Sequence, residues 1–137
     1  MAKFNFRFDR VLNYKETIET LKKNQYGVVK QRFDKEEDKL RHINDYKNSV
    51  VDERNSSCEN IKAGGLAMYN SYLNVLNDKI KIQEEVVLHT EHELEESKDE
   101  MIEAVKEKKM FVKLKENEFE QFVYEEKKEE DKIVDNL

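Results

Sequence analysis

The sequence predicts an all-α protein: a long antiparallel two-helix coiled-coil hairpin whose second helix is longer than the first. Two observations predict this class. Of the 137 residues, 41% are charged and 37% are hydrophobic, which is typical of coiled coils. Apolar residues also recur at steps of three and four along both halves of the chain, a regularity that disordered polar segments lack.

The first helix is predicted over about residues 9–54. Its seam, the row of residues that faces the other helix, contains a four-residue step that indicates a stutter close to the isolated glycine Gly27. The predicted seam residues are Val11, Tyr14, Ile18, Leu21 and Gln25, followed after the step by Val29, Phe33, Glu36, Leu40, Ile43 and Val50.

A connection is predicted over about residues 55–65. Asparagine and serine side chains in 54–60 compete for backbone hydrogen bonds and favour turns and caps. Glycine costs about 1 kcal/mol relative to alanine inside a helix, so we interpret the pair Gly64-Gly65 as the bend. The single cysteine, Cys58, cannot form an internal disulfide, which favours a reducing compartment.

The second helix is predicted over about residues 66–134, with a seam that steps strictly by three and four. Its apolar members are interrupted by Gln83, Thr90 and Ser97, which indicates a marginal helix pair. The full seam comprises residues 66, 69, 73, 76, 80, 83, 87, 90, 94, 97, 101, 104, 108 and 111.

Charge supports antiparallel pairing with residue 55 opposite residue 66. In this register the acidic block at 91–100 lies beside Lys22, Lys23 and Lys30. The alternative, that these blocks are separate solvated faces, stays open because exposed ion pairs contribute only about 0 to 1 kcal/mol.

The same register predicts a basic collar near the open end, where like charges meet and an acidic partner would be favoured. The collar comprises Arg7, Arg10 and Lys15 with Lys106, Lys108, Lys109, Lys113 and Lys115. The second helix also outruns the first by roughly 30 Å at 1.5 Å per residue. This overhang carries apolar residues that need a cover: Phe119, Phe122, Val123, Ile133, Val134 and Leu137. An N-terminal arm with Phe4, Phe6 and Phe8 is an alternative cover to a partner protein.

Several classes of function are disfavoured. A net charge of -6 argues against nucleic-acid binding. No apolar run is long enough to cross a bilayer. His89 and His92 share a helix face but lack an enclosed site, so no metal or other cofactor is expected. A two-helix hairpin has no interior in which to separate the pKa values of catalytic carboxylates, so neither enzymatic activity nor a small-molecule substrate is expected.

Three stretches resemble the flagellar export protein FliJ family: residues 3–12 (KFNFRFDRVL), 108–116 (KKMFVKLKE) and 125–135 (EEKKEEDKIVD). The resemblance covers essentially the whole chain. It implies a cytoplasmic component of the bacterial flagellar type III export apparatus, monomeric when alone and peripherally associated with the inner face of the cell membrane at the flagellar base. Family members act like a central stalk that binds the ring of the export ATPase and promotes its assembly and hydrolysis. They also contact the export gate and substrate-specific chaperones.

The resemblance assigns two candidate surfaces. The collar and overhang would bind the ATPase through Arg7, Arg10, Lys106, Lys108, Lys109, Lys113, Phe119 and Phe122. An apolar stripe toward the closed end would bind the gate through Ile43, Tyr46, Val50, Tyr72 and Leu76, unless these residues simply pack between the helices. Two other functions remain open: a structural or adaptor coiled coil that self-associates, and the stalk of a virulence-type secretion system.

Overall fold

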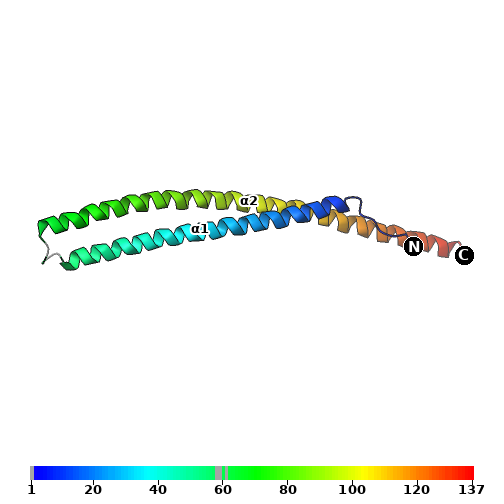
Figure 1. The fold of residues 1–137 in the computed structure, drawn as a ribbon. Coiled ribbons are helices and arrows are strands. Elements are labelled where there is room, and N and C mark those ends of the chain that lie inside the picture. Colours follow the sequence, from blue (N-terminus) through cyan, green and yellow to red (C-terminus); the bar gives the residue numbers. More distant parts are fainter. Residues whose placement is uncertain (1, 58–59, 61) are drawn as a thin grey trace. The chain divides into compact units, whose positions relative to one another are not determined.

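Two long helices packed against each other form the fold in the computed structural model, which describes residues 2–57, 60 and 62–137 (Figure 1). Helix α1 spans Asp9–Ser57 and the longer α2 spans Ala63–Asp135, so the predicted all-α class is confirmed. Cys58 lies outside the described residues. None of the helices in the described ranges is long and apolar enough to cross a membrane.

The chain divides into two units, and each contains a segment of both helices. Unit 1 combines Met1–Gln25 with Lys98–Leu137, and unit 2 is Tyr26–Ser97. Cross-helix contacts show that the segments run antiparallel within each unit. In unit 1, Lys15 pairs with Glu107 and Lys22 pairs with Glu100, so residue numbers fall along α2 as they rise along α1.

The same antiparallel order holds inside unit 2. The Nε2 of Gln83 donates to the Oε2 of Glu36 at 2.7 Å and to its backbone carbonyl at 3.0 Å. Farther along, Arg54 of α1 donates to Asn70 of α2 at 3.0 Å. Polar pairs of this kind fix register, because sliding one helix would leave both groups without a partner. The amide of Gln83 also holds the pKa of the Glu36 carboxyl below its usual range.

The predicted seam of α2 is confirmed at every position from 66 to 111, since each of these residues is buried or half-buried. Polar Thr90 is accommodated because its hydroxyl donates back to the carbonyls of Val86 and Val87. In unit 2 a buried apolar cluster forms between the helices from Val50, Leu73 and Leu76, with Val51 and Tyr69 packed against it.

The predicted seam of α1 is wrong over about its first four turns, from Val11 to Gln25. Val11, Tyr14 and Leu21 are exposed, and the inward positions lie one residue later. The true seam steps by three and four without a stutter: Leu12, Lys15, Glu19, Lys22, Tyr26, Val29, Phe33, Glu36, Leu40, Ile43, Lys47, Val50, Arg54 and Ser57. Charged residues are tolerated here because their aliphatic stems pack between the helices while their charged ends reach the surface.

The glycine pair is not the bend. Gly64 and Gly65 belong to the first turn of α2, where the carbonyl of Lys62 accepts hydrogen bonds from the N–H groups of Gly65 and Leu66 at 2.9 and 3.2 Å. No described glycine has a positive φ. The glycine cost of about 1 kcal/mol applies to helix interiors, whereas a first helical turn frays and depends less on helix propensity. The helices leave residues 58–62 between them.

Candidate functional site

The predicted basic collar does not bring like charges together. Within unit 1 four of its eight members pair with acids of α1 or α2: Lys15 with Glu107 at 2.8 Å, Lys108 with Glu19 at 3.4 Å, Lys115 with Asp9 at 3.2 Å and Arg7 with Glu118 at 4.0 Å. The sequence reasoning placed cations opposite cations and overlooked these acids, which neutralise half of the predicted collar.

Four cations of the collar remain available to a partner. Among the residues that the structure describes, no carboxylate lies within ion-pair distance of Arg10, Lys106, Lys109 or Lys113. Lys106, Lys109 and Lys113 are exposed at positions i, i+3 and i+7 of α2. We call these three lysines the basic strip. Together with exposed Met110 they line a shallow groove. A surface of this kind suits an acidic segment that also carries apolar side chains.

Glu19 contacts two lysines in unit 1, Lys23 at 3.0 Å and Lys108 at 3.4 Å. The hydrogen bond from Lys23, with Lys108 across the helix pair, lowers the pKa of the Glu19 carboxyl below its ordinary value of 4.5, although burial opposes this shift. A depressed pKa adds stability that is present above pH 4.5 and lost as the pH falls through the folded-state value.

Replacing Glu19 by glutamine therefore tests the acid sensitivity of unit 1. The wild-type chain should be the more stable of the two at pH 7, and its advantage should disappear as the pH falls below 4.5. Urea unfolding followed by circular dichroism at several pH values measures this difference. Glu120→Gln, at an exposed position of α2, is the control, and a pH-independent effect of Glu19→Gln would contradict this interpretation.

The overhang is partly covered by the N-terminal arm, residues 2–8. The ring of Phe4 lies 5.3 Å from that of Phe119 and 5.5 Å from that of Phe122 between centroids. Phe8 meets Phe111 edge-on at 6.1 Å, and Phe6 is buried. The arm therefore covers the first aromatic residues of the overhang. Farther along α2, Val123, Ile133 and Val134 are exposed, as is Leu137 beyond the end of the helix.

The five residues predicted to bind the gate separate into two groups. Tyr46 and Tyr72 are 51% and 41% exposed, whereas Val50 and Leu76 are only 5% and 3% exposed and pack between the helices. Ile43 is half-buried in the seam. Val50 and Leu76 are thus corrected to core residues, because a partner could contact them only by opening the helix pair.

The two exposed tyrosines form one feature. Their rings meet edge-on at 6.2 Å, and the hydroxyl of Tyr72 donates to that of Tyr46 at 3.1 Å. An aromatic pair already ordered in this way presents a large amphipathic contact surface with little side-chain entropy left to lose.

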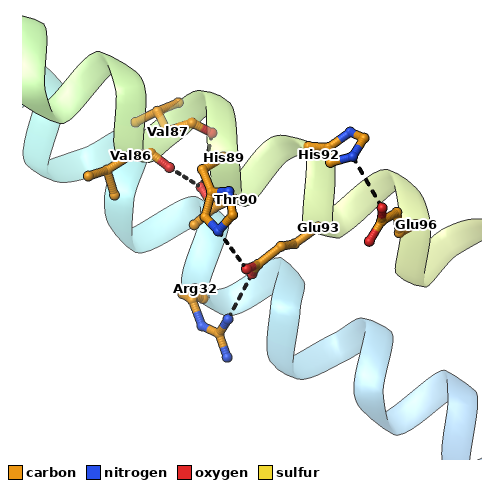
Figure 2. Close-up of polar contacts among 8 residues, drawn as sticks. All are labelled: Arg32, Val86, Val87, His89, Thr90, His92, Glu93 and Glu96. Atoms are coloured by element: carbon orange, nitrogen blue, oxygen red, sulfur yellow. Dashed lines mark hydrogen bonds and ion pairs between the residues drawn. The ribbon is translucent and has the colours of Figure 1, made fainter.

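The histidine pair does not form a shared site. Figure 2 shows each imidazole directed to a glutamate one turn farther along α2: His89 lies 3.0 Å from Glu93, and His92 lies 3.1 Å from Glu96. Glu93 also accepts from Arg32 of α1 at 2.9 Å. In the described part of the chain, no three His, Cys, Asp or Glu side chains are grouped to hold a metal ion.

The chain is similar to a known protein family over nearly its whole length. A family model described as "Flagellar FliJ protein" matches residues 4–137, nearly the whole chain. Searches of curated proteins and of solved structures gave no significant match.

Proposed function

Because the chain belongs to the flagellar FliJ family and is a component of flagellar protein export, we propose that it is the stalk that binds the ring of the flagellar export ATPase and promotes its assembly and hydrolysis. The chain itself is non-catalytic on this proposal, so its effect on ATP hydrolysis is exerted through contact with the ATPase.

The observation that carries the proposal is the unequal length of the helices in unit 1. Asp9, the first residue of α1, pairs with Lys115 of α2, and α2 then continues to Asp135 without a helix beside it. These twenty or so residues extend roughly 30 Å at 1.5 Å per residue. A single helix with exposed Val123, Ile133 and Val134 offers the elongated, partly apolar surface that a stalk inside a ring would use.

The basic strip adds a second contact to the same proposal. Lys106, Lys109 and Lys113 lie immediately before the unpaired part of α2 and have no acid of their own chain to neutralise them among the described residues. Their charges would therefore be available to acidic groups at the mouth of the ring. Arg10, which has no carboxylate within ion-pair distance among the described residues, and exposed Phe119 are further candidate contacts, whereas the paired Lys108 and Arg7 contribute less.

A chain cut after Asn117 tests the proposal by binding. The cut retains the Asp9–Lys115 pair and the basic strip but removes the unpaired helix. We expect the shortened chain to bind the purified export ATPase at least tenfold more weakly, because the contacts of the unpaired helix are lost. Titration by light scattering or interferometry measures the affinity, and equal affinities would remove the overhang from the contact.

We extend the proposal to the export gate through the exposed tyrosine pair. Replacing Tyr46 and Tyr72 together by alanine is expected to weaken binding to the cytoplasmic domain of the gate by roughly tenfold, since an exposed aromatic anchor contributes about 1 to 2 kcal/mol. Tyr14→Ala, at an exposed tyrosine of unit 1, is the control. Gate binding that responds equally to both changes would argue against this surface.

Contact with substrate chaperones and a position at the inner face of the membrane complete the proposal.

One observation favours a second candidate, the self-associating adaptor. Val11, Tyr14 and Leu21 form an exposed apolar stripe along α1, and two copies would cover it by packing together. The stalk proposal predicts a monomer in solution, and the adaptor predicts a dimer. Sedimentation equilibrium separates them, with Leu21→Ser expected to dissociate any dimer formed through the stripe.

A further inference from the structure

The arm, residues 2–8, occupies an aromatic stripe on α2 that consists of Phe111, Phe119 and Phe122. Phe4 packs against two members of the stripe, Phe119 at 5.3 Å and Phe122 at 5.5 Å, and Phe8 packs against Phe111 at 6.1 Å. Phe6 is buried beside Phe8. Alternate residues of the arm therefore face α2, as the F-x-F-x-F pattern of an extended segment allows.

Side chains hold the arm to α2. The arm has no helical or strand structure before the turn at 7–8, and the backbone carbonyls of Phe6 and Phe8 accept hydrogen bonds from Asp9 and Leu12 of α1. Beyond the aromatic contacts, Arg7 reaches Glu118 only at 4.0 Å, and Lys115 stands 5.9 Å from the centre of the Phe6 ring. Such a segment separates from α2 without breaking any helix.

The covered stripe overlaps the surface proposed to bind the ATPase. Phe119 and Phe122 begin the unpaired part of α2, and Phe119 remains 49% exposed beneath the arm. A partner that packs against the same aromatic faces must replace Phe4. Glu118, the acid nearest Arg7, also lies on this surface, so the arm both shields its apolar residues and offsets part of its negative charge.

We propose that the arm is an intramolecular competitor: it covers the aromatic stripe in the free protein and leaves the stripe when α2 binds the ATPase. This inference rests on the proposed stalk function and adds regulation of the same surface. The observed affinity is then the intrinsic affinity reduced by the fraction of molecules in which the stripe is open.

Phe4→Ser tests the inference because it removes the ring that packs the arm against α2 and changes no residue of either helix. The matched control is Asn5→Ser, at an exposed position of the same arm. Two measurements are made on each full-length chain: the rate of tryptic cleavage after Arg7, which follows the open population, and the dissociation constant for the purified export ATPase. For Phe4→Ser we expect cleavage faster and binding tighter, each on the order of tenfold, with no change for Asn5→Ser.

Each other outcome overturns a defined part of the account. Unchanged cleavage means that Phe4 does not hold the arm closed and overturns the inference. Faster cleavage with unchanged ATPase binding also overturns it, because the arm then does not compete with the ATPase. Faster cleavage with weaker binding overturns it as well, because the arm is then part of the contact. If neither the wild-type chain nor the variant binds the ATPase, the proposed function itself fails, and the competition fails with it for lack of a partner.

Discussion

Replacing Lys106, Lys109 and Lys113 together by glutamate is expected to weaken binding to the export ATPase roughly a hundredfold, since each reversal costs about 1 kcal/mol against an acidic partner. The effect should shrink at high salt, because the strip is exposed and its charges are screened. The folded state should change little, since none of the three lysines pairs with a carboxylate in the described part of the chain. The dissociation constant at two salt concentrations measures the effect.

Reversal of Lys79, Lys81 and Lys98 is the matched control for the basic strip. These three lysines are exposed on the same helix, and their reversal changes the net charge of the chain by the same amount. If both triple variants lose the same affinity, overall charge rather than the basic strip governs the association. If neither loses affinity, the strip takes no part in the contact.

Leu76→Ala is expected to have the largest effect on stability, a loss of about 2 to 4 kcal/mol. Leu76 is 3% exposed and packs with Val50 and Leu73 in the buried cluster of unit 2. The seams around this cluster contain many polar residues, so one cavity removes a large share of a total stability that is about 5 to 15 kcal/mol for ordinary domains. Urea unfolding followed by circular dichroism measures the loss.

The control for Leu76→Ala is Leu88→Ala, the same chemical change on the same helix at a side chain that is 67% exposed. Its effect should stay within about 0.5 kcal/mol. Equal losses at the two positions would show that helix propensity, rather than packing between α1 and α2, dominates stability. The comparison also separates a structural role of Leu76 from the gate contact first predicted for it.

The seam of α2 was predictable from sequence because its apolar residues coincide with the true inward positions from Leu66 to Phe111. The first turns of α1 were not. Val11, Tyr14, Ile18 and Leu21 form a regular apolar row, but the row beside it faces α2. Hydrophobic periodicity selects the more apolar row, whereas the fold selects the row whose charged ends find partners across the helix pair.

The candidate site was predicted in part for similar reasons. The exposed lysines of the basic strip were identified, but the pairing of Lys15, Lys108 and Lys115 depends on acids whose distance only the structure supplies. Tyr46 and Tyr72 were expected to be exposed if they serve a partner, and both are. Sequence spacing alone did not distinguish these tyrosines from the buried Val50 and Leu76, because residues three and four apart on a helix lie next to one another.

The central claim, that the unpaired part of α2 acts on the export ATPase, is tested most directly by the rate of ATP hydrolysis. The rate is measured for the purified cognate ATPase alone, with the full chain, and with the chain cut after Asn117. Stimulation by the full chain and none by the shortened chain is the result that this account predicts. Equal stimulation by both chains, or none by either, would contradict it.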